Sequence, residues 1–458
     1  MRFVRHACAV VALLAPFAAR AQTAPPPAAP PPAVPAFATP PPAAPEPEVV
    51  PSENDSEGYT PPVEGAGAPP SVVLNGYVDV GWADAQGDGT SFAPGDTRIP
   101  ADYGVDPFAP AVNSRGDVAS TDSHGLFTNG FLPHSVGIGG RPSFLINAVV
   151  ADLKYTAPSA PLTIFTRLVA LPRFNSQDGG DATHVLVEQA FGRIVPFDSL
   201  ELALTVGKFD SVFGIEYLDN QSNIRTGITP SLVARYTTGQ SVGAKLFYRL
   251  QLAPIWSALS INMAATNSGT FIDALQTPDV SLTGVPVGSV RVGYELNLPK
   301  VQVKAGGSGM YGVRNDQSDR GARQHAVGAD LRVALFGVYL NAEYVRVGED
   351  GGGPKVNDSG AFMFASEFHA RGYYGQLAYA FAVDAGPLHK ITPYARYEQR
   401  HAWFGGYTPV TVARVTGGLR FDLWESLIVK GEYLVNQERA GAPQVANNVL
   451  TTSVVYSW

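Results

Sequence analysis

Few residues in this chain of 458 have the types and spacing that catalysis or ligand binding needs. The stretch 307–312, GSGMYG, matches the glycine spacing of a dinucleotide-binding fingerprint. That fingerprint requires a helix that starts within it, because the N–H groups and dipole of the helix hold the pyrophosphate. No helical pattern follows here, and glycines that ease the curvature of a β-strand explain the motif better.

The other candidate sites are weaker. None of the eight histidines is paired at metal-ligand spacing, and the nearest grouping, Glu367 with His369, falls in a predicted outer loop. The runs DAQGDG (84–89) and GEDGGG (348–353) do not follow the ligand order of a calcium loop. No serine lies in a recognisable nucleophile elbow. We therefore expect no enzyme, no cofactor and no metal site.

Charged residues that recur at alternate positions carry more information. Side chains two residues apart in a strand share one face, so these charges would gather on a single face. On that face bases outnumber acids, although the whole chain has a formal charge of -8. The bases are Arg167, Lys245, Arg249, Arg291, Lys304, Arg332, Arg396, Arg400, Arg414, Arg420 and Lys430, and the acids are Glu201, Glu295, Asp330, Glu343, Glu398, Asp422 and Glu432. If the face lines water, these pore-lining charges predict a mild anion preference; alternatively, opposite charges on neighbouring strands pair and brace the wall.

The elements that must carry these charges alternate with a period of two. The segments VVLNGYVDVGWAD (72–84), LELALTVGKF (200–209) and SVRVGYELNL (289–298) each have one apolar face. The opposite face mixes Gly, Ser, Asn, Tyr and single charges, and only 16% of all residues are charged. A soluble sandwich would expose many Lys and Glu residues there, so the composition favours a wet lumen.

The lengths of the links between these segments indicate the topology. Short links (157–161, 195–199, 251–255, 297–300, 335–337, 384–390, 422–426) alternate with long ones (85–139, 173–182, 210–239, 267–287, 314–323, 348–371, 401–410, 437–447). This alternation predicts an all-β fold, a transmembrane antiparallel up-and-down barrel of about 16 strands. Pro393 should then lie among the first residues of its strand. The mixed parity of 144–157 predicts a bulge near Val149 or Val150.

The first part of the chain has a different composition. Arg2 and Arg5 precede an apolar run, 7–19, and Ala19-Arg20-Ala21 follows, which predicts a secretory signal peptide over 1–21 for the Sec pathway. The only cysteine, Cys8, lies within it. Residues 22–70 are rich in Pro and Ala and are predicted to be a disordered linker, and 71–458 is the barrel. No basic run favours nucleic acid.

The chain finishes on a strand with an aromatic face. Trp458, Tyr456 and Val454 share one side, where the rings would lie at a membrane interface. The ending resembles the C-terminal targeting signal of Gram-negative outer-membrane barrels, with Trp in place of the usual Phe. The resemblance implies insertion into the outer membrane by the barrel-assembly machinery.

A second resemblance covers residues 186–246. The segment has Gln189, then Gly207 to Phe209, Phe213 to Glu216, Asn220 to Asn223, and Thr238-Gly239 before a return strand. In these features it is similar to the putative beta-barrel porin family of Gram-negative outer membranes, the OmpL-like group. It departs from that group in having YTTGQS where a proline is expected before the return strand.

These inferences predict an outer-membrane porin that lets small hydrophilic solutes diffuse passively. A long loop would constrict the lumen: either 210–239, with Asn220, Asn223 and Arg225, or 85–139. Outer-membrane lipid and lipopolysaccharide are the expected surroundings, and a homotrimer is a possible assembly. The alternative is a plugged barrel that serves as an envelope anchor or adhesin, and a lipid hydrolase or protease is the weakest hypothesis.

Overall fold

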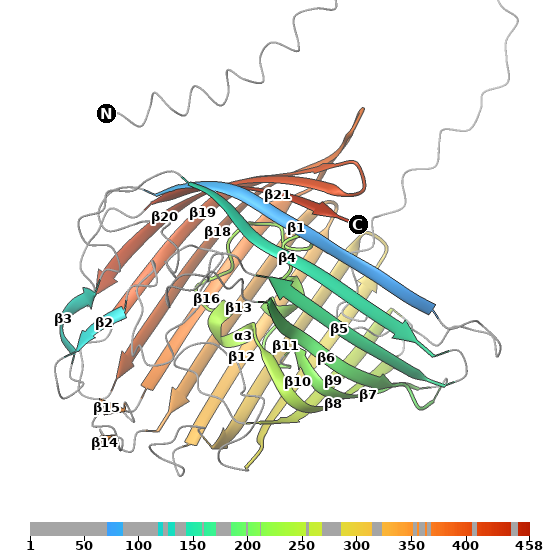
Figure 1. Cartoon of the computed structure of the whole chain (residues 1–458), viewed down its shortest axis with the longest axis horizontal. Coiled ribbons are helices and arrows are strands. Elements are labelled where there is room, and N and C mark those ends of the chain that lie inside the picture. The colour runs from blue at the N-terminus through green and yellow to red at the C-terminus, as the bar shows by residue number, and fades with distance from the viewer. Residues whose placement is uncertain are drawn as a thin grey trace, which may run out of the picture. The chain divides into compact units, whose positions relative to one another are not determined.

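The wall of the molecule is a ring of antiparallel strands, drawn in Figure 1. The computed structural model describes residues 71–85, 118–121, 127–132, 143–157, 160–170, 185–197, 200–210, 212–252, 256–267, 285–313, 323–350, 355–356, 362–363, 368–404, 410–440 and 448–458. The wall strands in this part of the chain are β1 (Ser71–Ala85), β4 (Ser143–Thr156), β5 (Leu162–Ala170), β6 (Val185–Ile194), β7 (Glu201–Asp210), β8 (Gln240–Leu252), β9 (Ser257–Thr266), β10 (Val287–Leu298), β11 (Val301–Val313), β12 (Arg323–Leu335), β13 (Val338–Glu349), β16 (Phe368–Tyr379), β17 (Phe381–Ala385), β18 (Leu388–Phe404), β19 (Val410–Leu423), β20 (Leu427–Ala440) and β21 (Val449–Ser457). Two small hairpins, β2 (Val118–Thr121) with β3 (Phe127–Leu132) and β14 (Lys355–Val356) with β15 (Phe362–Met363), lie apart from this sheet.

The sheet closes on itself. Each strand pairs with its sequence neighbours, and β1 pairs with both β4 and β21. Trp458 continues the seam beyond β21, since its N–H donates to the Gly76 carbonyl at 3.1 Å and its own carbonyl accepts from the Gly76 N–H at 3.3 Å. The sheet has 17 strands, and β16 and β17 are two pieces of one, so the wall has 16. The predicted all-β barrel of about 16 strands is confirmed, and closure leaves no free sheet edge.

The polarity of the wall is inverted relative to a soluble protein. In β10 the outward Val290, Val292 and Tyr294 are 40%, 43% and 42% exposed, whereas Arg291 and Glu295 on the opposite face are buried. The same parity holds in β7, where Leu204 and Val206 are exposed and Thr205 is buried. The alternation read from the sequence therefore assigns the two faces of the barrel correctly. Among the described residues, no helix has the length and apolar character to cross a membrane.

Tight turns at one end of the barrel have the backbone that such turns require. Phe336 and Gly337, which join β12 to β13, both have positive φ angles, 47° and 84°. Two successive positive φ values match the twist of the flanking strands. Lys300, Gly386 and Trp424 take positive φ values in three other short turns at the same end. The chain thus reverses direction in a few residues at each of these predicted short links.

Pro393 lies inside its strand and not among its first residues, contrary to the expectation. It is the sixth residue of β18 and pairs with Leu419 of β19. Proline has no N–H to donate, so one of the two ladders beside it must be interrupted. The interruption falls on the other side, between β16 and β17 at Ala380, whose own N–H donates to the Gly337 carbonyl at 2.8 Å.

The bulge in β4 is real, but its position was predicted two to three residues too late. Asp79 of β1 pairs with Ala148 while Val80 pairs with Ile146, so Asn147 is the extra residue. The Asn147 side chain donates to the Asp79 carboxylate at 2.8 Å. A bulge that turns one extra side chain inward reconciles the two halves of the strand.

Glycines in the wall make room for side chains that lie across them. Arg291 of β10 reaches over Gly306 of β11 to form an ion pair with Asp330 of β12, at 2.8 Å. A Cβ atom on Gly306 would lie 2.7 Å from Nη2 of Arg291 and 2.8 Å from the Asp330 carboxylate. Gly306 immediately precedes the stretch that matches a dinucleotide fingerprint, and the structure places all of that stretch in β11, as predicted.

Gly306→Ala should therefore destabilise the barrel, because both ionic side chains are almost completely buried and cannot move aside freely. We expect a loss of about 1–3 kcal/mol in the free energy of unfolding, measured by urea titration of the purified protein. Gly417→Ala is the control, since Gly417 in β19 has nothing within 4 Å of an added Cβ. Equal stability of the two variants would contradict this account of Gly306.

Candidate functional site

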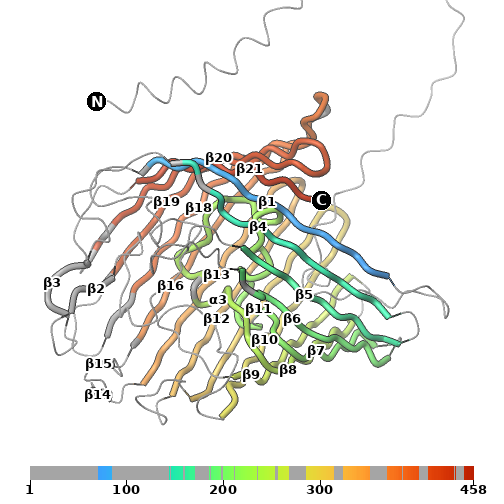
Figure 2. The backbone as a smooth tube through the Cα atoms, in the orientation of Figure 1, coloured from blue at the N-terminus to red at the C-terminus, as the bar shows by residue number. Residues whose placement is uncertain are grey.

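A long segment enters the barrel between β7 and β8. Residues 212–239, here called the inner loop, contain the short helices η3 (Glu216–Asp219) and α3 (Ala234–Thr237). In Figures 1 and 2 the inner loop is the green segment around α3, within the ring of strands. Phe213, Ile215 and Val233 are fully buried. The inner loop is held by side chains from strands on several sides of the wall.

The first part of the inner loop is bound to β11, β12 and β13. The Gly214 N–H donates to the Ser308 hydroxyl at 3.1 Å, and the Ile215 N–H donates to the Glu343 carboxylate at 2.8 Å. Arg332 donates to the Ile215 carbonyl at 2.9 Å and forms an ion pair with Asp219 at 2.9 Å. Both polar groups of the Ile215 backbone are thus satisfied by the wall, which removes the cost of burying them.

The middle of the inner loop is held by two cations. Nζ of Lys430 donates to the carbonyls of Ser222, Arg225 and Gly227 at 2.6, 2.5 and 3.0 Å. Arg420 donates to the Ile224 and Arg225 carbonyls at 3.0 and 3.1 Å and to the Asn223 carbonyl at 3.3 Å. Three carbonyl oxygens around one ammonium group use all of its donors. These residues of β19 and β20 therefore determine the course of 222–227.

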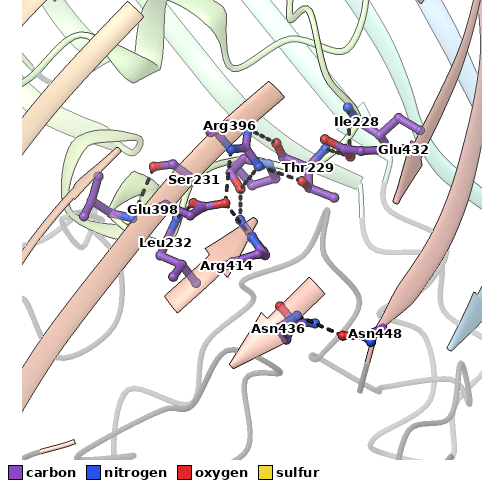
Figure 3. Close-up of polar contacts among 12 residues, drawn as sticks. Ile228, Thr229, Ser231, Leu232, Arg396, Glu398, Arg414, Glu432, Asn436 and Asn448 are labelled. Carbon is purple, nitrogen blue, oxygen red and sulfur yellow. Dashed lines mark hydrogen bonds and ion pairs between the residues drawn. The ribbon is translucent and has the colours of Figure 1, made fainter. Parts of the chain in front are cut away.

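The last part of the inner loop lies against a buried ionic cluster from β18 and β19 (Figure 3). Glu398 accepts from Arg396 at 3.1 Å and from Arg414 at 2.6 Å. Its other oxygen accepts from the Leu232 N–H at 2.6 Å. All three charged side chains are 0–3% exposed.

The two arginines of this cluster also bind the inner-loop backbone directly. Arg396 donates to the carbonyl and the hydroxyl of Thr229, each at 2.8 Å. Arg414 donates to the Pro230 carbonyl at 2.5 Å. Glu432 of β20 accepts from the Ile228 and Thr229 N–H groups at 3.2 and 2.9 Å. Donors and acceptors on the wall alternate to match those of the loop backbone.

Another side of the wall contributes Tyr77 and Glu188. The Tyr77 hydroxyl donates to the Gln221 side chain at 2.7 Å and accepts from the Ser222 N–H at 3.3 Å. Gln221 donates in turn to Glu188 at 3.2 Å, and β6 has a bulge at Glu188. The inner loop is thereby connected to β1 and β6 as well as to the strands opposite.

Internal contacts and close approaches fix the shape of the inner loop. Glu216 accepts hydrogen bonds from the N–H, at 2.6 Å, and the hydroxyl of Ser231, which joins the two arms of the loop. Burial raises the pKa of the Glu216 carboxyl above its ordinary value, and the two hydrogen bonds from Ser231 act in the opposite direction. On the wall, Gly372 leaves room for Val233, whose Cγ1 would lie 2.5 Å from an added Cβ.

The structure places the predicted pore-lining residues on the inward side of the strands, but most of them are not bare charges. Arg291, Arg396, Glu398, Arg414, Lys430 and Glu432 are at most 4% exposed; Arg291 binds Asp330, and the others bind the inner loop or each other. Arg249 forms ion pairs with Glu201 and Glu295, and Arg167 forms one with Asp152. Lys245 lies 5.3 Å from the centre of the Phe209 ring, and Lys304 and Arg400 are buried. The side chains of Arg167, Arg249, Arg332 and Arg420 retain 12–16% exposure.

The residues proposed from sequence for a constriction all lie in the inner loop. Asn220 and Asn223 contribute through their backbone carbonyls, which accept from Arg225 and Arg420. Arg225 donates to the carbonyls of Asn220 and Ile228, at 3.3 and 2.5 Å, and so fastens the loop to itself. The other candidate, 85–139, lies mostly outside the described residues, which include only 85, 118–121 and 127–132 of it.

Sequence reasoning did not identify the side chains that shape the loop as site residues. Gly214, Glu216 and Gln221 entered only through the ranges of the resemblance to the OmpL-like group, and neither Tyr77 nor Ser231 was proposed. No periodic pattern marks the loop residues, because a loop has none, and the period of two in 72–84 gives the face of Tyr77 but not its partner. The available signal was the apolar run Val212, Phe213 and Ile215 inside a long polar link, since such residues are seldom left in water. Within the described residues no group of three or more His, Cys, Asp or Glu side chains is arranged to hold a metal ion.

Comparison with known proteins identifies the fold. No protein-family model matches the chain, and no curated protein sequence matches it significantly. The outer membrane channel DcaP of Acinetobacter baumannii is similar in structure, with a TM-score of 0.50 and 11% identity over 86% of this chain and 98% of that one. The anion-selective porin from Comamonas acidovorans has a TM-score of 0.47 at 11% identity over 85% and 100% of the two chains. Salmonella typhi OmpF has 0.46 at 13% identity over 84% and 97%. At this level of identity the likeness to DcaP shows a shared fold.

Gly214 should be needed for the inner loop to dock. Its φ is +79°, and a Cβ atom would lie 2.3 Å from Oε1 of Glu343. Gly214→Ala is therefore expected to loosen the loop, and tryptic cleavage after Arg225 in the folded protein should become several times faster. Gly386→Ala is the matched control, because Gly386 has φ +64° but open space around it. Both variants should lose about 1–2 kcal/mol from backbone strain. A cleavage rate in Gly214→Ala no faster than in the control would refute the role of the close approach.

Proposed function

We propose that the protein is an outer-membrane channel through which small hydrophilic solutes diffuse passively, without catalysis or a cofactor. The observation that carries the proposal is the inverted polarity of a closed barrel. Exposed Val, Leu, Ile and Tyr side chains cover its outside, and charged side chains face inward. A surface of that kind is stable in hydrocarbon and unfavourable in water. DcaP, which has the same fold, is an outer membrane channel.

The route to the membrane is part of the proposal. Residues 1–21 would direct export through the Sec pathway, and 22–70 would remain as a linker ahead of the barrel; both ranges lie outside the described residues. Val454, Tyr456 and Trp458 would be read by the barrel-assembly machinery. Tyr456 and Trp458 are 53% and 48% exposed on the outer face, which suits such a signal and an aromatic belt. Membership of the OmpL-like porin group, a Gram-negative source and a homotrimeric assembly remain predictions.

The inner loop is the proposed constriction. Because it crosses from β7 to the strands opposite, solutes would pass beside it. The charges that stay partly exposed there are of both signs. The side chains of Arg167, Arg249, Arg332 and Arg420 are 12–16% exposed, and those of their partners Asp152, Glu201, Asp219 and Asp422 are 16–33% exposed, so each base is offset by an acid. We therefore expect an anion preference that is weak. The sequence alone overstated the charge that a solute would meet in the lumen. It counted side chains that are buried and paired with opposite charges or with backbone carbonyl groups.

One observation favours the alternative of a plugged barrel. The inner loop is bonded to β1, β11, β12, β13, β18, β19 and β20, which is extensive anchoring for a loop that needs only to narrow a passage. A barrel closed in this way would act as an envelope anchor or adhesin. Conductance distinguishes the two functions.

Single-channel recording of the purified protein in a phosphatidylcholine bilayer is the direct test. An open channel should give steady ohmic steps, and a salt gradient should give a reversal potential that slightly favours anions. A reversal potential that favours cations would refute the anion preference. Absence of current from a protein that is shown to be folded by its heat-dependent gel mobility would refute the open channel and support the plugged barrel.

A cysteine at position 224 tests the constriction. Ile224 is 42% exposed although it lies in the inner loop, so its side chain should border the solute path. In a Cys8→Ser background, Ile224→Cys modified with an anionic methanethiosulfonate should lower the conductance and shift selectivity towards cations. Phe336→Cys, at an exposed turn, is the control and should show no change after the same modification. Complete labelling of position 224 with unchanged current would place the path elsewhere.

A further inference from the structure

Two arginines and three histidines lie close together on the outside of the barrel. In the register of the sheet, Arg346 of β13 lies directly opposite Arg371 of β16, and Arg371 lies opposite His401 of β18. Two residues beyond Arg346 in β13, Gly348 lies opposite His325 of β12 on one side and opposite His369 of β16 on the other. These residues, here called the outer basic row, come from successive strands of the wall.

The outer basic row faces away from the lumen. Arg346 and Arg371 are exposed. Val345 and Val347, which flank Arg346 in β13 and lie on the opposite face of the strand, are buried. Two residues along the same strands, on the same face, Tyr344 and Tyr373 are each 41% exposed. The row therefore continues the outward face of the wall and lies at the edge of its apolar band.

The arrangement is unfavourable for the protein by itself. Residues directly opposite on antiparallel strands have Cβ atoms about 4.5–5.5 Å apart, and like charges at that separation destabilise the sheet. Within the described residues no ion pair joins a carboxylate to either guanidinium. Arg346 and Arg371 are thus two cations held side by side, and an anion between them would remove the repulsion.

The surroundings indicate what kind of anion fits. Guanidinium groups bind phosphate oxygens in a bidentate manner. Gly348 lets the two imidazole rings, whose centres are 6.5 Å apart, come together over its backbone, because a Cβ atom there would lie 2.6 Å from Cε1 of His325 and 2.9 Å from Nδ1 of His369. Next to the row stand Tyr373 and Tyr397, with ring centres 6.2 Å apart, and beyond them the exposed apolar face continues with Leu377. A phosphate attached to acyl chains would satisfy both parts of this surface.

We propose that the outer basic row binds the phosphate groups of a phosphorylated glycolipid of the outer leaflet, with the acyl chains lying on the apolar face beside Tyr373 and Leu377. The proposal rests on the proposed function, which puts the barrel in the outer membrane with its long links outside. The row is three residues from the end of β13 that leads into such a link, at the level of the outer headgroups.

Binding of diphosphorylated lipid A to the full-length protein in dodecyl maltoside, followed by native mass spectrometry, tests the proposal. Lipid A should stay bound, phosphatidylcholine should not, and equimolar inorganic phosphate should not displace lipid A. Arg346→Gln or Arg371→Gln should weaken binding about tenfold, as expected for one lost charge-assisted hydrogen bond. Lys300→Gln, at an exposed turn of the opposite end, removes the same charge and should leave binding unchanged.

The thermal midpoint without lipid A separates binding from a structural role. Arg371→Gln should unfold at the same temperature as the wild type or a higher one, because it relieves the repulsion with Arg346. A lower midpoint, equal weakening by Lys300→Gln, or displacement by inorganic phosphate would each overturn the proposal. The conductance of Arg371→Gln in phosphatidylcholine should equal that of the wild type. If neither protein conducts, the open channel is refuted, whereas the lipid site is judged by the binding measurement alone.

Discussion

The structure depends on the match between buried charges on the inner wall and the polar backbone of residues 212–239. A closed barrel that turns its apolar side outward must put its charged residues inside, where burial is costly unless each charge is paired and hydrogen-bonded. Glu398 has Arg396, Arg414 and the Leu232 N–H, and Lys430 has three carbonyl oxygens. The loop backbone has the same need in reverse, since it contains little regular secondary structure to satisfy its own groups. Wall and loop thus stabilise each other.

This mutual dependence explains which parts of the structure could be predicted from sequence. The faces of the strands follow from a local rule, the period of two, and so Arg291 and Glu295 were assigned correctly to the inside. The alternation of short and long links likewise gave the topology. The partners of each charge do not follow from a local rule: Arg396 is 167 residues away from Thr229, and nothing near either residue points to the other. Parity shows where a charge points but does not show whether water or a carbonyl group meets it.

The errors have the same origin. Pro393 was expected at a strand start because a barrel strand has a neighbour on both sides, yet the wall tolerates the missing donor by interrupting β16 and β17 at Ala380. The bulge in β4 falls at Asn147, where the Asp79 carboxylate of the neighbouring strand β1 binds the Asn147 side chain. In both cases a partner on another strand decides a position that the segment's own sequence leaves open.

The loop also has a mechanical consequence. A thin cylinder of strands has little resistance to flattening, because its wall can bend along every strand pair. Residues 212–239 leave the wall between β7 and β8 and are fastened to Glu343 on one side and to Arg414 on another, so they form a strut across the bore. Flattening the cylinder would stretch or compress that strut and break its bonds. In the proposed membrane location, lateral pressure from the bilayer would therefore act on the loop as well as on the wall.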